Sequence, residues 1–329
     1  MESAAVGELA ASGDWDSETI ETADAQSVAV DTIGLYDPGR SQFLLRNSND
    51  MGFADMDFVF GPSQAGWQPL AGDWSNDGTD TVGLYDPSTG TFYLRDSNYE
   101  GATDRYFGYS PPGAHWQPLA GDWDGDGVDS VGLYDPAGSI FHLHNSNAAG
   151  QDLVLAYGPP GRGWRPLVGD FDGDGVDSVG LYDPYAAVFY LRNTNTSGVA
   201  DLQFAYGRHR MDLLPVAGDF DNDGTDTIGL YDPYRSRFLL RNSNDSGIAD
   251  LDFPYGPQGA KWLPLVGDFD GTLDAGATGP DEFADSAPAG PPGLKDLVAY
   301  ADSLTDSTRR PDARGERDST AIDIWGIAE

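Results

Sequence analysis

The sequence of 329 residues contains no cysteine, which excludes disulfide bonds, thiolate metal sites and a cysteine nucleophile. No apolar run reaches the roughly 18 residues that a transmembrane helix needs, so we expect no insertion into a membrane. Basic residues are few: 18 Lys and Arg stand against 54 Asp and Glu, which gives a net charge of −36. Because a surface of this sign repels phosphate, nucleic acid is not an expected partner.

Aromatic residues, in contrast, are plentiful, and 43 Gly and 22 Pro are spread along the chain. This composition indicates a folded protein with many turns. Two triplets recur about every 49 residues. The first, Gly-Asp-aromatic, has its aspartate at Asp14, Asp73, Asp122, Asp170, Asp219 and Asp268. The second, Tyr-Asp-Pro, begins at Tyr36, Tyr85, Tyr134, Tyr182 and Tyr231.

Each repeat divides at turn residues into four short β-type runs, which in the third copy are 117–123, 130–134, 139–144 and 152–157. Four antiparallel strands repeated at this spacing predict an all-β fold, a β-propeller of four-stranded antiparallel blades. We count five full blades plus a partial sixth, and we favour a six-bladed ring over a five-bladed one. The expected organisation is repeats over 9–270, an insertion over 271–319 with a short helix at 294–304, and a closing strand at 320–328.

A tryptophan recurs six residues before the Gly-Asp step, at Trp67, Trp116, Trp164 and Trp262, and Leu213 takes its place in one copy. We expect these side chains to pack between blades, with a sugar-stacking platform as the alternative. Arg46, Arg95, Arg192 and Arg241 also recur, and we expect them to pair with the Tyr-Asp-Pro acids.

The strongest chemical signal is an aspartate loop between the first and second strands of each repeat. Numbered from the Gly-Asp aspartate, three copies have acids at positions 1, 3 and 5 and glycine at position 6. Such a loop can wrap a hard cation, and Ca²⁺ prefers six to eight oxygen ligands. Position 12 is Leu133, Leu181 or Leu230, so the loops are not EF-hands. The alternative is an Asp/Gly turn without metal.

This loop, repeated at blade spacing, resembles the FG-GAP/VCBS repeats of integrin α-subunit heads and of bacterial surface and secreted proteins. The resemblance covers roughly 9–270 and implies a propeller with Ca²⁺ as its cofactor. The implied ligands are the side chains of Asp122, Asp124 and Asp126, of Asp170, Asp172 and Asp174, and of Asp219, Asp221 and Asp223, with the carbonyls of Val128, Val176 and Thr225. A weaker second loop has Asp73 and Asp77, with Ser75 between them.

One feature departs from the integrin-type loop, whose last acid stands at position 9. Here the acid stands at position 8, as Asp80, Asp129, Asp177 and Asp226. We include these four among the candidate metal ligands.

The blade-to-blade connections and the Tyr-Asp-Pro turns differ most between copies, and propeller topology places both on the rim opposite the aspartate loops. Variable loops on a rigid scaffold commonly bind ligands. The candidate ligand residues there are Arg162, Arg165, Arg208, Arg210, Arg235 and Arg237. They favour an anionic partner, either an acidic glycan or a carboxylate-bearing protein segment, with ordinary solvated charges as the alternative.

The sequence has no Gly-x-Ser-x-Gly, His-Glu-x-x-His or phosphate-loop motif, so we do not expect an enzyme. Its opening residues lack the features of a signal peptide. Nevertheless, weak calcium sites are filled at the millimolar Ca²⁺ outside cells, and this favours an extracellular or cell-surface location. We therefore predict a monomeric binding, adhesion or scaffold module for a protein or glycan ligand. A glycan-binding lectin is the alternative, and a hydrolase is a weaker one.

Overall fold

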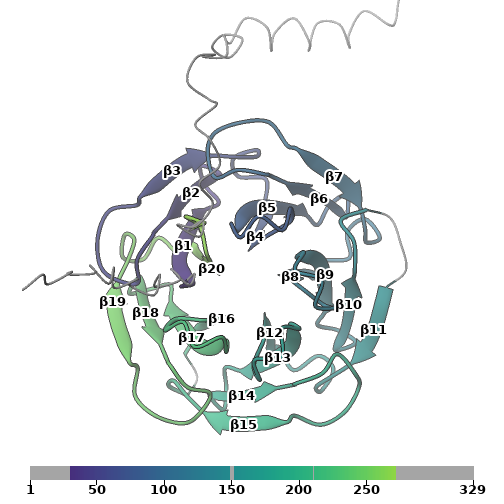
Figure 1. The fold of residues 1–329 in the computed structure, drawn as a ribbon, viewed down its shortest axis with the longest axis vertical. Coiled ribbons are helices and arrows are strands. Elements are labelled where there is room, and N and C mark those ends of the chain that lie inside the picture. The colour runs from purple at the N-terminus through teal and green to yellow at the C-terminus, as the bar shows by residue number, and fades with distance from the viewer. Residues whose placement is uncertain (1–29, 149–151, 210, 272–329) are drawn as a thin grey trace, which may run out of the picture. The chain divides into compact units, whose positions relative to one another are not determined.

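The computed structural model describes residues 30–148, 152–209 and 211–271, which form five four-stranded antiparallel sheets arranged radially as a β-propeller (Figure 1). The innermost strands are β4 (Gln68–Gly72), β8 (Gln117–Gly121), β12 (Arg165–Gly169), β16 (Leu214–Gly218) and β20 (Leu263–Gly267). The second strands are β1 (Thr32–Asp37), β5 (Thr81–Asp86), β9 (Ser130–Asp135), β13 (Ser178–Asp183) and β17 (Thr227–Asp232).

The two remaining strands of each blade lie farther from the axis. The third strands are β2 (Gln42–Leu45), β6 (Thr91–Leu94), β10 (Ile140–His144), β14 (Val188–Leu191) and β18 (Arg237–Leu240). The outer strands are β3 (Met56–Val59), β7 (Arg105–Gly108), β11 (Asp152–Ala156), β15 (Leu202–Ala205) and β19 (Leu251–Pro254). In the third repeat these bounds agree with the predicted runs to within two residues.

Burial falls from the second strand outward, and this explains the sequence pattern of the blades. The second strands are almost wholly buried, because strands flank them on both sides and neighbouring blades cover both faces. The apolar centre of a short run such as TIGLYD suits that place. The third strands alternate between buried and half-buried residues, and the outer strands expose every second side chain or more.

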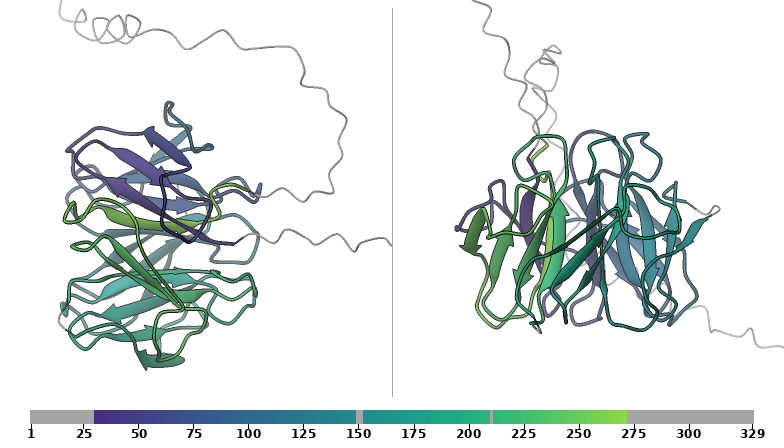
Figure 2. Two further views of the ribbon diagram at one scale, coloured as in Figure 1. Left: turned by 90° about the vertical axis from the view of Figure 1, so that its left-hand side faces the viewer. Right: turned by 90° about the horizontal axis from the view of Figure 1, so that it is seen from below.

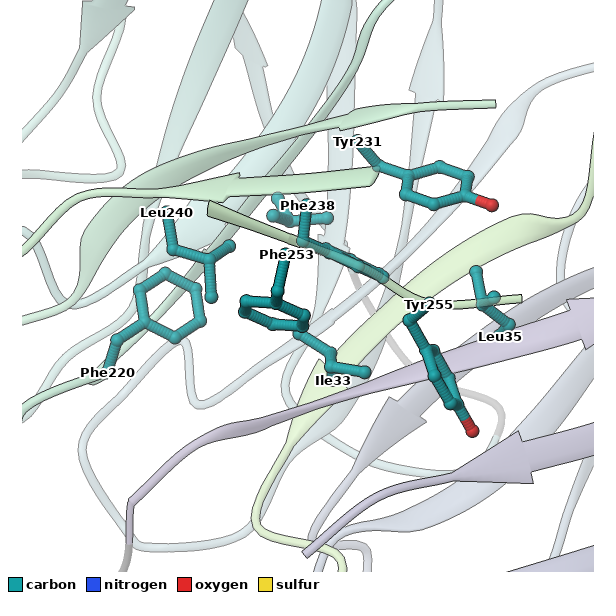
Figure 3. Close-up of a cluster of buried hydrophobic side chains, with 9 residues drawn as sticks. Ile33, Leu35, Phe220, Tyr231, Phe238, Leu240, Phe253 and Tyr255 are labelled. Carbon is teal, nitrogen blue, oxygen red and sulfur yellow. The ribbon is translucent and has the colours of Figure 1, made fainter. Parts of the chain in front are cut away.

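The hydrophobic core lies between adjacent blades. One cluster joins Ile33 and Leu35 of β1 to Phe238 and Leu240 of β18, with Tyr255 beside them (Figure 3). Equivalent clusters fill the other junctions between blades. The recurring tryptophans border these junctions: the ring of Trp67 stacks on Tyr93, with their centroids 4.5 Å apart. The expected packing between blades is therefore present.

The ring closes with five blades in the described residues. Strand β20 pairs antiparallel with β1, from Thr32↔Gly267 to Tyr36↔Leu263, so the first blade combines segments from the two ends of the repeat array. The innermost strands contact one another in a closed circle, with β20 touching both β16 and β4 (Figure 1). Figure 2 shows the ring of blades from the side. Asp268 therefore follows the inner strand of the first blade and does not open a sixth. The expected insertion at 271–319, its helix at 294–304 and the closing strand at 320–328 lie outside the described residues, apart from Gly271.

The recurring arginines do not pair with the Tyr-Asp-Pro acids, so that prediction was wrong. Arg192 is 7% exposed and forms an ion pair of 2.8 Å with Asp201, at the end of the loop between β14 and β15. The other three make the same pairing: Arg46 with Asp55, Arg95 with Asp104 and Arg241 with Asp250. The Tyr-Asp-Pro acids instead accept backbone N–H groups of their own turns, as Asp183 does from Tyr185.

Candidate functional site

The aspartate loops share one hydrogen-bonded frame. In the third blade, the carboxylate of Asp122 accepts the N–H groups of Gly125 and Asp126 at one oxygen and that of Gly127 at the other, over 2.7–3.2 Å. The position 5 carboxylate of Asp126 accepts the N–H of Val128 at 2.9 Å. Gly127 has φ of +82°, a conformation that glycine adopts without strain. The loops that begin at Asp73, Asp170 and Asp219 repeat this frame.

This frame brings the predicted acids together in three loops. The carboxylates of Asp122, Asp124 and Asp126 have ligand oxygens within 4.8 Å of one another, and the same holds for Asp170, Asp172 and Asp174, and for Asp219, Asp221 and Asp223. The acids at positions 3 and 5 are exposed. Desolvation, and then repulsion from the two neighbouring carboxylates, raises the pKa of Asp172 and of Asp221. Three such oxygens suit a hard cation, whose charge would relieve the repulsion.

Side chains of the loops between the third and outer strands reach the aspartate loops, so both sets of loops lie on one rim. We call this the loop rim. Asn145 donates its amide to the position 3 carboxylate of Asp124 at 2.8 Å. The later asparagine of the same loop, Asn147, donates to the backbone carbonyl of Asp129 at 2.7 Å. Asn49, Asn98, Asn195 and Asn244 make the equivalent bond in the other blades.

The structure places the position 8 aspartates at contacts between blades. Asp129 of the third blade donates its N–H to the carbonyl of Asp73 in the second blade, and its carboxylate accepts the N–H of Asp73, both at 2.9 Å. We call this reciprocal pair of hydrogen bonds a clasp. The other clasps join Asp177 to Asp122, Asp226 to Asp170, Asp31 to Asp219 and Asp80 to Asp268. Among the described residues, no position 8 acid belongs to a three-acid group.

The clasp also explains the glycine of the Gly-Asp step. A Cβ atom on Gly121 would lie 2.7 Å from the carboxylate of Asp177, so a side chain there would collide with the next blade. Burial, followed by repulsion from nearby acids, works against ionisation of these carboxyls. Burial raises the pKa of Asp129 and of Asp31 to about 7. It also holds the pKa values of Asp80, Asp177 and Asp226 well above their usual range.

The candidate ligand arginines that the structure describes occupy different parts of the opposite rim, which we call the connection rim. Arg208, Arg235 and Arg237 line one cleft of about 330 Å³ beside the fifth blade. Arg165 lines a separate hollow of about 480 Å³, with the inner strands of all five blades, and pairs with Asp212. Arg162 is exposed in the connection between β11 and β12 and lines neither hollow. Arg210 lies outside the described residues.

The cleft of the fifth blade combines opposite charges with an apolar floor. Its apolar lining residues are Met211, Leu213 and Leu239, and we call these three its apolar floor. Among its charged lining residues, Arg235 pairs with Asp232 at 2.7 Å, and Arg237 pairs with Asp252. Because Arg235 and the backbone N–H groups of the turn stabilise its charge against the cost of burial, the pKa of Asp232 lies below its usual value. The sequence predicted the arginines of this cleft, but not the acids or the apolar floor.

Comparison with known proteins identifies no family. No family model matches the chain, and no curated protein does. Among solved structures, it is similar to an Agrocybe aegerita lectin described as recognising non-reducing terminal N-acetylglucosamine, with 15% identity and a TM-score of 0.40. That match covers 74% of this chain and 72% of the lectin. Hsv2 of Kluyvelomyces marxianus gives 9% identity and a TM-score of 0.33, covering 67% and 76% respectively.

Among the described residues there is no helix with the length and apolar character needed to span a membrane.

Proposed function

We propose that this protein is a calcium-stabilised β-propeller that acts as an extracellular binding module. The observation that carries the proposal is the convergence of three carboxylates in each of three equivalent loops. A loop with a charge of −3 gains from a divalent cation, because the cation replaces repulsion by attraction. The hydrogen bonds of the position 1 aspartate hold each turn before the cation arrives, and this lowers the entropy cost of binding.

Calcium would act mainly on stability. Each loop also carries a clasp to the next blade, so an ion that fixes the loop would fix the junction between two blades. Extracellular modules bind Ca²⁺ with dissociation constants of about 0.1–1 mM. At 1 mM free Ca²⁺, a single site of that affinity contributes about 0.4–1.4 kcal/mol of stability, and three sites contribute about 1–4 kcal/mol.

The test is thermal unfolding in 1 mM Ca²⁺ and in excess chelator, with metal analysis of the purified protein. We expect a melting temperature that is several degrees higher with Ca²⁺. Asp124→Asn should reduce this shift by removing one ligand charge. Asp77→Asn is the matched comparison and should reduce the shift less, since the second loop already lacks the position 3 acid. An unchanged melting temperature together with no bound calcium would refute the proposal.

A glycan-binding lectin is the second candidate function, and the cleft of the fifth blade favours it. Apolar atoms, arginine donors and carboxylate acceptors together match the faces and hydroxyls of a sugar ring. A glycan array in Ca²⁺ tests this candidate, and binding that disappears when the cleft is altered is the supporting result.

A further inference from the structure

The cleft of the fifth blade is a break in the internal symmetry of the ring. In three of the connections that lead to an inner strand, a tryptophan stacks on an aromatic residue of the third strand at 4.5 Å: Trp67 on Tyr93, Trp116 on His142 and Trp164 on Tyr190. In the first blade Trp262 packs in one cluster with Leu44. In the fifth blade this place holds Leu213, which shares a cluster with Leu239.

The smaller leucine stands where the other connections have a tryptophan, and a cleft lies at this place. Leu213 and Leu239 are both part of the floor of the cleft of about 330 Å³. That volume lies within the range of small-molecule sites, which are about 300–1,000 Å³. The same connection also has Arg208 where the corresponding connections have Pro62, Pro111, Pro159 and Pro257. This one connection therefore differs from the other four at two places that line the cleft. It has Leu213 in place of tryptophan and Arg208 in place of proline.

One of the three arginines that line the cleft has no acidic partner among the described residues and can pair with a ligand. Arg235 is paired with Asp232, and Arg237 is paired with Asp252. Arg208 is exposed and forms no ion pair with any described residue. The five charged residues that line the cleft therefore sum to +1, in a chain whose net charge is −36. A locally positive cleft on an acidic protein selects an anionic ligand, because the rest of the surface repels it.

We propose that this cleft binds a hexuronate residue of an acidic glycan, an inference that rests on the proposed role as a binding module. The carboxylate of the sugar pairs with Arg208, whose planar guanidinium can hold it through two hydrogen bonds. The C–H face of the ring packs on the half-buried side chains of Met211 and Leu239, in the cleft that the buried Leu213 also lines. A ring hydroxyl donates to the Asp252 carboxylate, which uses only one of its two oxygens for Arg237. Each part of the ligand thus has a matching group.

The test measures binding of oligogalacturonate and oligoglucuronate to the full chain in 1 mM Ca²⁺ by calorimetry. Each oligomer is compared with its carboxyl-reduced, neutral form and with a peptide that ends in a free carboxylate. We expect the uronates to bind and both comparison ligands to bind roughly tenfold more weakly or worse. The neutral form lacks the charge-assisted, two-bond contact with Arg208, and the peptide lacks the sugar ring that packs on Met211 and Leu239.

Two variants locate the site, and one serves as control. Arg208→Ala should weaken uronate binding by roughly tenfold or more. Leu213→Trp should abolish it while preserving the fold, because it restores the residue that the other four connections have, and Trp262 already packs with a leucine. Arg162→Ala removes an equal charge from an exposed site outside the cleft, so it should bind as the wild type does.

The inference is overturned if neither uronate binds, if the neutral forms or the peptide bind equally well, or if folded Leu213→Trp protein keeps wild-type affinity. These outcomes are distinct from failure of the proposed function. If Ca²⁺ stabilises the protein but no uronate binds, the calcium proposal stands and the uronate inference is wrong. If Ca²⁺ does not stabilise the protein, the calcium proposal is wrong. The uronate titration then still tests whether the cleft binds this sugar.

Discussion

The fourth blade lacks a buried hydroxyl that the first and third blades contain, and restoring it should stabilise the ring. In the third blade, Ser139 lies 3.0 Å from the hydroxyl of Tyr134 and donates to the carbonyl of Tyr157 at 2.6 Å. Ser41 does the same in the first blade. The fourth blade has Ala187 at this place, and the hydroxyl of Tyr182 is buried with no hydrogen-bond partner among the described residues.

The backbone of the fourth blade already suits a serine. Ala187 has φ of +53° and Ser139 has +54°, and the carbonyl of each accepts an N–H, from Tyr206 and Tyr157 respectively, at 3.0 Å. In Ala187→Ser the new hydroxyl would donate to the carbonyl of Tyr206 and accept from Tyr182. An unpartnered buried hydroxyl costs about 1–3 kcal/mol, so the gain should be about 1–2 kcal/mol. In a domain of this size that corresponds to a melting temperature roughly 2–8 °C higher.

Thermal and urea unfolding of matched variants would measure this difference. Ser139→Ala should lower the free energy of unfolding by about 1–3 kcal/mol. It leaves the hydroxyl of Tyr134 without its partner, as the hydroxyl of Tyr182 is in the wild-type fourth blade. Tyr182→Phe should be neutral or slightly stabilising, whereas Tyr134→Phe should destabilise by about 1 kcal/mol. The reasoning fails if Ala187→Ser melts lower than the wild type, or if the two Tyr→Phe variants cost the same.

The remaining predictions concern the clasps on the loop rim. Gly121→Ala should destabilise the protein by about 2 kcal/mol or more in urea unfolding, since its Cβ would meet Asp177 at 2.7 Å and Val168 at 2.9 Å. Asp129 has a pKa of about 7 in the folded state and 3.8 as its ordinary value, so the folded protein holds an extra proton between these pH values and loses that stability as pH rises through 7. In chelator, the stability advantage of Asp129→Asn should therefore grow from pH 4.5 to pH 7.5, by at most about 3 kcal/mol; a pH-independent difference would contradict this. Asn195→Ala should lower the free energy of unfolding by about 1 kcal/mol, because it removes the hydrogen bond to the Asp177 carbonyl. An unchanged urea midpoint would show that this bond does not stabilise the protein.

The sequence was sufficient for the architecture of one repeat. The Gly-Asp and Tyr-Asp-Pro triplets have a spacing of about 49 residues, and turn residues separate the four strands. Local signals of this kind place strand ends well, because they depend on neighbours in the chain. The same holds for the three-acid loops, whose members lie within five consecutive residues.

Ring closure could not be predicted in the same way. The Gly-Asp-aromatic triplet occurs both at Asp14 and at Asp268, so two segments had equal claim to be the inner strand of the first blade. Only the pairing of β20 with β1 decides between them for the described residues. That pairing joins residues about 235 positions apart, a separation at which local patterns carry no information.

The contacts of the position 8 aspartates could not be predicted from the sequence, for a related reason. Asp129 is adjacent in sequence to the carbonyl expected to bind a cation, which suggested a shared site. Its partner is instead Asp73, 56 residues earlier and in another blade. Likewise, Leu213 was visible as an exception among tryptophans, but the cleft that it opens also needs Asp232 and Asp252, which only the fold brings near.

Because β20 completes the first blade, vectorial synthesis on the ribosome imposes an order on assembly. Strands β1–β3 emerge early and must wait for the partner that covers their inner edge until nearly all other blades have been made. During that interval β1 presents unpaired backbone groups, which are a template for pairing with the wrong strand. Deleting β20 should therefore do more than remove one strand, because it also removes the contacts with β16 and β4 that close the inner circle.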